Sequence, residues 1–370
     1  MSINNALIIG LGLIGGSLAK ALKYKAGLKN IWAMDVKDEY VKAAYDQGVI
    51  NCPAQAGKEQ INKSDLIVIC TPVLKTIDIL EKILPYVRSG CIITDVGSTK
   101  SMLMDRVAKI LPRDLCFIGG HPMAGSENSG YHFSSHHIFE NAYYILTPCP
   151  NHNNTSLDRF KKVIEAMGSI PIVMDARLHD RITGLISHLP HILSGGLINL
   201  VMSMDTEEGH GRKLAAGGFK DITRISSSSP EMWRDICISN KEQLVEIINL
   251  YIKKLDTFKT WLKDNEKDKL YGYFDHARKY RNGLSSVRTG FIYPYFDIVV
   301  DVEDRPGVIG AVSTLLGSHG INIKNIGIIN SREGEPGCLS ISLTSHQQQQ
   351  RAFEILRHNG YKVFIKDNGK

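Results

Sequence analysis

The stretch ALIIGLGLIG, residues 6–15, decides the fold of the N-terminal part of the chain. It joins an apolar run to glycines at positions 10, 12 and 15, in the spacing GxGxxG, and an amphipathic helical pattern follows directly. In this context the first glycine allows a tight turn, the second lets the backbone approach a pyrophosphate, and the third lets helix and strand pack closely. The stretch therefore predicts a strand, a phosphate-binding turn and a helix whose N-terminus faces a dinucleotide.

The predicted cofactor site also includes the ends of two further strands. Asp35 ends the second predicted strand, 20 residues after Gly15, where a carboxylate can accept hydrogen bonds from the adenosine ribose. This position favours NAD over NADP, although Lys37 nearby could tolerate the extra phosphate of NADP. The residues predicted to bind NAD are Gly10, Leu11, Gly12, Leu13, Ile14, Gly15, Asp35, Thr71 and Pro72, the last two at the C-terminal end of the strand LIVIC.

Three kinds of pattern follow one another along the chain. From Ala6 to Met174, continuous apolar runs alternate with amphipathic segments, which indicates a parallel sheet covered by helices on both faces. From Asp175 to residue 292, apolar residues recur at helical spacing. From Tyr295 onward the order is βαββαβ, the ferredoxin-like arrangement. The sequence therefore predicts a Rossmann-like α/β domain at 1–175, an all-α domain at 176–290 and a ferredoxin-like domain at 291–370.

Composition excludes several classes of protein. A chain of 370 residues with 43% apolar and 22% charged residues is typical of a folded protein with more than one domain. The balance of 44 Lys plus Arg against 38 Asp plus Glu, without a long basic run, does not indicate a nucleic-acid partner. The seven cysteines form no CxxC pair and are expected to be reduced thiols. No cleavable leader and no run of 18 uninterrupted apolar residues is found, so we expect a cytoplasmic protein without a membrane partner.

Polar and glycine-rich segments mark the candidate chemical site. They are DVGST (95–99), GGHPMAGSENSG (119–130), HLPH (188–191), GGFKDITR (217–224) and MWRD (232–235). His121 follows a short strand and is held by Pro122, which would place its imidazole at the C-terminal edge of the sheet, beside the nicotinamide. Hydride transfer from an alcohol needs a base for the hydroxyl proton, and neutral histidine suits that role at pH 7.

The HLPH segment also permits a structural or metal-binding interpretation. His188 and His191 lie three residues apart and would share one helix face, and Pro190 between them would distort the helix. No acidic third ligand accompanies them at helical spacing, so no metal site is predicted. Arg224 and Arg234 carry guanidinium groups suited to carboxylates, although either could equally be a surface residue.

The motifs GLGLIGGSLA, DVGSTK, GGHPMAGSE, SHLPH, GGFKDITR and MWRD, in this order from Ala6 to Arg281, resemble those of the prephenate dehydrogenase family. The resemblance implies that His121 is the catalytic base, that Ser98 hydrogen-bonds near the substrate hydroxyl and the nicotinamide, and that Arg224 binds a substrate carboxylate. It further implies a pocket lined by His191, Glu127, Gly217, Asp221 and Trp233. The family dimerises through its helical domain, so a homodimer is expected, with 176–290 as the substrate-binding and dimerisation domain.

The implied reaction is the NAD-dependent oxidative decarboxylation of prephenate to 4-hydroxyphenylpyruvate in tyrosine biosynthesis, with no cofactor beyond NAD. Arogenate is an alternative substrate, because Glu127 or Asp221 could meet its ammonium group. A non-catalytic sensor of NAD and amino acids is a second alternative, against which the joint presence of His121, Ser98 and Arg224 argues.

Residues after Tyr295, with DRPG at 304–307, resemble the ACT domain, a regulatory amino-acid-binding module. We expect Pro306 in the first turn of a helix and an uncovered backbone at Gly307, so that amide groups can meet a ligand carboxylate. The resemblance implies tyrosine as the effector, and the residues predicted to bind it are Asp304, Arg305, Pro306 and Gly307. An ordinary strand-to-helix turn remains an alternative, as does competition by tyrosine at the active site through Arg224 and His191.

Overall fold

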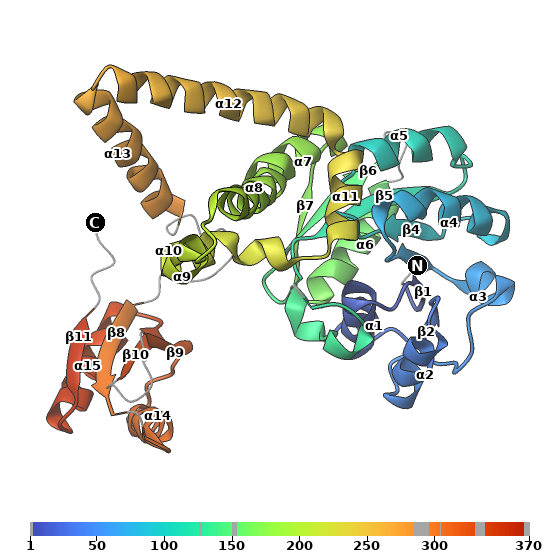
Figure 1. Ribbon diagram of the computed structural model, residues 1–370. Coiled ribbons are helices and arrows are strands. Elements are labelled where there is room, and N and C mark those ends of the chain that lie inside the picture. The colour runs from blue at the N-terminus through green and yellow to red at the C-terminus, as the bar shows by residue number, and fades with distance from the viewer. Residues whose placement is uncertain are drawn as a thin grey trace. The chain divides into compact units, whose positions relative to one another are not determined.

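The computed structural model describes residues 3–125, 128–149, 154–284, 296–303, 305–329 and 337–365 (Figure 1). The chain divides into two compact units, residues 1–263 and residues 264–370. The predicted boundary between residues 175 and 176 falls inside the first unit, and the one between 290 and 291 falls outside the described residues. Both boundaries therefore stay predictions.

A seven-stranded sheet in the order β2-β1-β3-β4-β5-β6-β7 forms the centre of the first unit. Its strands are β1 (Asn5–Ile9), β2 (Asn30–Met34), β3 (Leu66–Ile69), β4 (Ile92–Asp95), β5 (Cys116–Pro122), β6 (Tyr143–Pro148) and β7 (Ile170–Val173). The first five strands pair in parallel, as predicted. The prediction of an entirely parallel sheet is wrong at its far edge, because β6 runs antiparallel to β5, and β7 then runs parallel to β6.

The reversal at β6 follows from the connection that precedes it. Tyr144 pairs with Pro122, so the connection from β5 to β6 begins and ends at the same edge of the sheet. In its described part this connection holds only the short 3₁₀ turns η3 (Tyr131–Phe133) and η4 (His136–Phe139), which pack on helix α1. A parallel strand would need a crossover to the opposite edge, and an apolar run by itself carries no information on strand direction.

Helices cover both faces of this sheet (Figure 1). They are α1 (Leu13–Tyr24), α2 (Asp38–Asp46), α3 (Lys58–Lys63), α4 (Thr76–Ile83), α5 (Ser101–Ile110) and α6 (Asn154–Ala166), with the 3₁₀ turns η1 (Val73–Lys75) and η2 (Leu84–Tyr86) beside α4. Ile8 of β1 packs in one apolar cluster with Leu18, whereas its neighbours Leu7 and Ile9 pack in a second cluster with Leu80. Both faces of β1 are therefore buried, which is why its sequence is continuously apolar.

The rest of the first unit is helical, as predicted. Its elements are α7 (Ala176–Thr183), the π-helical turn η5 (Gly184–His188), α8 (Leu189–Met204), α9 (His210–Leu214), α10 (Gly217–Thr223), the 3₁₀ turn η6 (Arg224–Ser227), α11 (Pro230–Ser239) and α12 (Lys241–Lys263). The π-helical turn η5 ends two residues before Pro190, whose missing N–H and ring prevent regular α-helical bonding there. The helical stretch 176–204 is long enough to cross a membrane and contains an 18-residue window apolar enough to do so, with a mean hydropathy of 1.4.

The second unit contains α13 (Lys267–Leu284) and a four-stranded antiparallel sheet in the order β11-β8-β10-β9. Its elements are β8 (Phe296–Val302), α14 (Val308–Ser318), β9 (Asn325–Ile329), β10 (Gly337–Leu343), α15 (His346–His358) and β11 (Lys362–Ile365), which confirms the predicted βαββαβ order. The predicted helix start at Pro306 is wrong: Gly307 has φ +88° and lies before the first helical residue, because a left-handed residue cannot continue a right-handed helix.

Candidate active site

The glycine turn between β1 and α1 has the shape that a pyrophosphate site requires. Gly10 has φ +99°, and a Cβ there would lie 2.5 Å from the Cys70 carbonyl oxygen, so only glycine fits. A Cβ at Gly15 would overlap the Gly10 carbonyl oxygen, whereas a Cβ at Gly12 would meet no atom within 4 Å. The turn therefore packs tightly on the protein at Gly10 and Gly15 but leaves free space at Gly12. Helix α1 begins next to this space, and no side chain caps its N-terminus.

Asp35 and Thr71 lie beside this turn. The Asp35 carboxylate accepts hydrogen bonds from the backbone N–H groups of Leu11 at 2.5 Å and Lys37 at 2.8 Å, which fixes it next to the glycine turn. The Thr71 hydroxyl oxygen is buried and has no hydrogen-bond partner among the described residues, and the Thr71 methyl group would lie 3.4 Å from a Cβ at Gly10. A buried hydroxyl that lacks a partner is typical of a ligand site, so these residues fit a bound dinucleotide.

The β5 strand delivers His121 to the C-terminal edge of the sheet, where His121 meets helix α7. The His121 Nδ1 atom lies 2.8 Å from Nε2 of His179, and the His179 Nδ1 atom lies 2.8 Å from Oδ1 of Asp180. His179 and Asp180 are both 0% exposed, whereas His121 is partly exposed. The structure therefore adds two residues to the predicted site.

Asp180 is held by the loop that follows β4. Its two carboxylate oxygens accept hydrogen bonds from the backbone N–H groups of Lys100 at 2.7 Å and Ser101 at 2.8 Å. Burial raises the pKa of Asp180, but the hydrogen bonds from His179, Ser101 and Lys100 together outweigh burial and hold its pKa below the usual value. Asp180 is therefore a buried anion at neutral pH.

His179 and Asp180 were not predicted from the sequence, because neither lies in a glycine-rich motif. A weak signal was present: the buried residues of α7 are His179, Asp180 and Thr183, whereas its Leu178 is 50% exposed. A helix whose buried face is polar departs from the usual amphipathic pattern, and the polar residues at positions i, i+1 and i+4 mark that face.

A buried ion pair lies beneath the DVGSTK segment. The Lys100 Nζ atom lies 2.5 Å from Oδ2 of Asp95, and both side chains are 0% exposed. Asp95 also accepts hydrogen bonds from the backbone N–H groups of Gly97 at 2.8 Å and Gly120 at 3.1 Å. A Cβ at Gly120 would lie 2.5 Å from the Asp95 carbonyl oxygen, so β5 needs glycine before His121 to approach this pair.

The surroundings of His121 keep it neutral. Burial lowers its pKa well below 6.5, and electrostatic interactions with His179, Lys100 and His188 lower it further. A neutral imidazole at pH 7 can accept a proton, as a general base must. Ser98, the other residue implied to contact the substrate hydroxyl, is partly buried in the bend between β4 and α5, two residues before Lys100.

His188, His191 and Trp233 form a second cluster. The rings of His191 and Trp233 stack with centroids 3.5 Å apart, and His188 meets Trp233 edge-on at 5.9 Å. Burial lowers the pKa of His188 to about 4, and burial also lowers the pKa of His191. The His191 Nε2 and Trp233 Nε1 atoms are buried and have no hydrogen-bond partner within the described part of the chain, which suits a pocket that binds a polar substrate. Within the described ranges, no three His, Cys, Asp or Glu side chains are grouped to hold a metal.

The remaining predicted substrate residues lie around α10. Gly217 begins α10, Asp221 is exposed on it, and Arg224 begins η6 directly after it and is also exposed. Both α10 and η6 pack against α8, the helix that carries His191. Arg234 instead bonds the neighbouring Asp235 carboxylate at 2.8 and 2.9 Å. Glu127 lies outside the described residues.

Comparison with known proteins identifies this arrangement. Residues 18–173 match the nucleotide-binding domain of prephenate dehydrogenase, residues 175–276 its dimerization domain, and residues 296–357 the ACT domain. A prephenate dehydrogenase from Bacillus subtilis is 37% identical, with 98% of each chain covered, and one from Lactococcus lactis is 33% identical, with 95% of this chain and 96% of that protein covered. The chain belongs to the prephenate dehydrogenase family.

Solved structures of the prephenate dehydrogenase family agree with this assignment. The Aquifex aeolicus prephenate dehydrogenase, solved with hydroxyphenyl propionate and NAD+, has a TM-score of 0.72 and 32% identity over 77% of this chain and 99% of that one. The predictions of a Rossmann-like domain, an ACT domain and an NAD-dependent dehydrogenase are confirmed. The alternative of a non-catalytic sensor is therefore set aside.

Proposed function

We propose that this chain oxidatively decarboxylates prephenate to 4-hydroxyphenylpyruvate with NAD as the oxidant. The observation that carries the proposal is His121, a neutral and partly buried imidazole at the C-terminal edge of the sheet that also carries the glycine turn. The two curated relatives above 30% identity are both prephenate dehydrogenases. The glycine turn with Asp35, Thr71 and Pro72 would hold NAD, which would supply the hydride acceptor for the ring carbon, and the substrate ring would serve as the electron sink for loss of carbon dioxide.

The residues of the chain have separate roles in this proposal. His121 removes the proton of the ring hydroxyl, and Ser98 donates or accepts a hydrogen bond at the same oxygen. Arg224 binds a substrate carboxylate through its guanidinium fork. The residues proposed to line the rest of the pocket are His191, Glu127, Gly217, Asp221 and Trp233. The residues proposed to hold NAD are those of the glycine turn with Asp35, Thr71 and Pro72.

The test of the proposed function is a comparison of substrates and cofactors. NADH formation is followed with prephenate and with arogenate, each with NAD and with NADP. We expect turnover with prephenate and NAD to give the highest kcat/KM. A solved arogenate dehydrogenase from Synechocystis shares 26% identity with this chain and a TM-score of 0.67, so a higher kcat/KM for arogenate is the outcome that would replace prephenate as the substrate.

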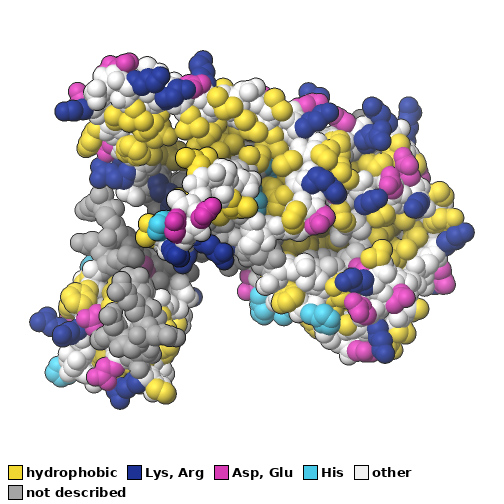
Figure 2. All heavy atoms as spheres, in the orientation of Figure 1, with side chains coloured by type: hydrophobic (Ala, Val, Ile, Leu, Met, Phe, Trp, Pro, Cys, Tyr) yellow, Lys and Arg dark blue, Asp and Glu magenta, His cyan; other side chains and the backbone are white. Residues whose placement is uncertain are grey.

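We further propose that the enzyme is a cytoplasmic homodimer joined through its helical domain. Exposed apolar side chains gather on α8 and α12 (Figure 2); examples are Leu200, Met202, Val245, Leu250 and Leu255. A single copy of the chain leaves this surface in water, which is costly unless a partner covers it. A second copy is the partner that the dimerization-domain match favours, and it also explains why residues 176–204 are apolar enough to cross a membrane. Sedimentation equilibrium is expected to give twice the monomer mass.

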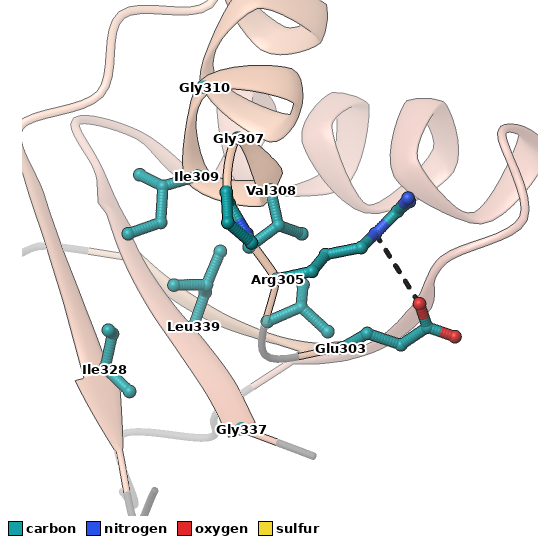
Figure 3. A pocket seen from close by; sticks show the side chains of 11 residues that line it. Glu303, Arg305, Gly307, Val308, Ile309, Gly310, Ile328, Gly337 and Leu339 are labelled. Carbon is teal, nitrogen blue, oxygen red and sulfur yellow. Dashed lines mark ion pairs between the residues drawn. The ribbon is translucent and has the colours of Figure 1, made fainter. Parts of the chain in front are cut away.

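We also propose that tyrosine binds the ACT domain at the start of α14. A pocket of about 370 Å³ lies there, lined by residues that include Arg305, Pro306, Gly307 and Ile328. Figure 3 shows Ile309, Ile328 and Leu339 around one side of this pocket, and the Arg305 guanidinium turned toward Glu303, 3.5 Å away. Apolar walls suit an aromatic ring, and the open backbone at Gly307 suits a carboxylate. Asp304 lies outside the described residues.

A further inference from the structure

We propose that His179 and Asp180 are positioning residues that set which nitrogen of His121 accepts the substrate proton and join this base to the loop that carries Ser98. The proposal rests on the proposed role of His121 as base. It is carried by the unbroken line of hydrogen bonds from His121 through His179 to Asp180, and from Asp180 to the backbone of Lys100 and Ser101.

The hydrogen bonds to Asp180 determine which nitrogen atoms of His179 and His121 carry a proton. The backbone N–H groups of Lys100 and Ser101 can only donate, so the Asp180 oxygens that they meet must accept. With Asp180 an acceptor, the Nδ1 atom of His179, 2.8 Å away, must carry a proton and donate it. A neutral imidazole has one N–H group, so the Nε2 atom of His179 has a free lone pair and accepts.

The acceptor at Nε2 of His179 in turn fixes the tautomer of His121. Its Nδ1 atom, 2.8 Å from the accepting Nε2 of His179, must be the protonated nitrogen. The Nε2 atom of His121 therefore keeps its lone pair, and this is the atom that can take the proton of the substrate hydroxyl. In that step the O–H bond breaks, an Nε2–H bond forms, and the O–H electron pair stays with the substrate oxygen.

Asp180 also stabilises the cation that this step creates. Once protonated, His121 donates from Nδ1 to His179, which in turn donates to the Asp180 carboxylate, so a fixed negative charge lies at the end of the line. Among the described residues, the other charged or titratable groups that act on His121 are Lys100, which is paired with Asp95 at 2.5 Å, and His188. A paired lysine and a neutral histidine cannot supply a negative charge, so within this described set the charge comes from Asp180.

The Asp180 carboxylate thus orients both groups that are proposed to contact the substrate hydroxyl, His121 and Ser98. Lys100 and Ser101 follow Ser98 in the chain by two and three residues, so the two N–H bonds to Asp180 fix the end of the Ser98 loop. On the helix side, the backbone carbonyl of Asp180 accepts a hydrogen bond from Asn240 at 2.9 Å, and that of His179 accepts one from Thr183 at 3.0 Å. Such support from surrounding groups is what holds catalytic groups in productive geometry.

The test uses two substitutions at His179 in the full-length enzyme. His179→Phe keeps the ring but removes the acceptor, and we expect kcat to fall by about two to three orders of magnitude, since a base with the wrong nitrogen protonated is lost to catalysis. His179→Gln keeps an oxygen that can accept from Nδ1 of His121 but loses the link to Asp180, so we expect a smaller loss, of about tenfold. The KM for NAD is expected to be unchanged in both.

Asp180→Asn provides an independent measurement. It removes the negative charge while keeping the side-chain shape, so the imidazolium form of His121 is less stabilised and the pKa of His121 falls. The acid limb of kcat/KM against pH is therefore expected to move to lower pH, together with a loss in kcat of about two orders of magnitude. The matched control is Asp175→Ala, which removes the N-cap of the same helix, where Asp175 accepts from Arg177 N–H at 2.8 Å. It is expected to lower Tm while kcat stays within about threefold.

The proposal is overturned if His179→Phe and His179→Gln lose equal activity in proportion to their loss of Tm, or if the acid limb of Asp180→Asn does not move. It is also overturned if all three variants keep kcat within about threefold. Should His179→Phe fail to fold, the Gln and Asn variants still decide the matter. His121→Asn, measured in parallel, tests the role of His121 separately from that of His179 and Asp180. Full activity of His121→Asn refutes the proposed base itself. If His121→Asn is inactive while the His179 variants stay active, only the positioning role is refuted.

Discussion

The active site and the ACT loop place charged groups in opposite surroundings. Beside His121, the residues Asp95, Lys100, His179 and Asp180 are all 0% exposed, and each is fixed by hydrogen bonds. At the start of α14, Arg305 and Glu303 form an ion pair whose side chains are 71% and 82% exposed. Water screens the second pair but not the first group. Catalysis of proton transfer is favoured by fixed, desolvated partners, whereas the charged side chains at an effector site that exchanges its ligand with solution can stay mobile and solvated.

The largest effect on activity is expected at the centre of the buried group. His121→Asn removes the proposed base, so turnover with prephenate should fall by about two to four orders of magnitude. Binding of NAD, measured by titration of protein fluorescence, should survive because the glycine turn is untouched. A turnover within threefold of the original enzyme at neutral pH would show that His121 is not the base.

The buried ion pair should matter mainly for stability. Lys100→Met leaves the Asp95 carboxylate in the interior without a counter-charge, which should cost about 3–5 kcal/mol of unfolding free energy. Urea denaturation measures this loss, and Lys100→Met combined with Asp95→Asn should recover part of it. Glu303→Gln is the matched control from the exposed pair and should leave the unfolding curve unchanged. An equal loss of unfolding free energy in Lys100→Met and Glu303→Gln would contradict the distinction between the buried and the exposed ion pair.

Substitution of Arg224 measures how much an exposed guanidinium contributes to substrate binding. Arg224→Ala should raise the KM for prephenate by about 10- to 100-fold, the value of a charge-assisted hydrogen bond, with a smaller change in kcat. Steady-state kinetics at several prephenate concentrations measures both constants. An unchanged KM in a folded variant would move the proposed carboxylate site elsewhere, with Arg234 as the next candidate.

Asp35 tests the specificity of the cofactor site. Asp35→Ala removes a negative charge that should repel the extra phosphate of NADP. The ratio of kcat/KM with NAD to kcat/KM with NADP should therefore fall by about tenfold. Asp38→Ala, which removes an exposed carboxylate bonded to Gln55 at 2.7 Å, is the control and should leave the preference intact. An original enzyme that already prefers NADP would contradict the interpretation of Asp35.

The smallest effect is expected at the ACT loop. Gly307 has φ +88°, and a Cβ there would meet no atom within 4 Å, so Gly307→Val strains the loop without filling the core. Inhibition by tyrosine should then need a several-fold higher concentration, while activity without tyrosine is unchanged. Gly317→Ala, on α14, is the control. Undiminished inhibition in Gly307→Val and after deletion of residues 295–370 would place tyrosine in the catalytic pocket, with Arg224 and His191.

The sequence by itself determined the elements and their order. The GxGxxG turn, the βα alternation, the helical middle and the βαββαβ order were all predicted, because each depends on residues close together in the chain. Several proposed site residues, His121 and Ser98 among them, also lie in short motifs whose glycines and prolines leave a local signal. The spacing of neighbouring residues was enough to predict any feature that depends on a single strand, turn or helix.

Only the tertiary structure decided the direction of β6 and the partners of His121. Strand direction depends on which edge a connection returns to, and an apolar run is the same in either direction. His121 and His179 are 58 residues apart, and Lys100 and Asp180 are 80 apart, yet each pair is bridged by a hydrogen bond. A hydrogen bond forms only within about 3 Å, and such distances arise when the sheet and the helices pack, so the line that orients the base could be found only in the folded chain.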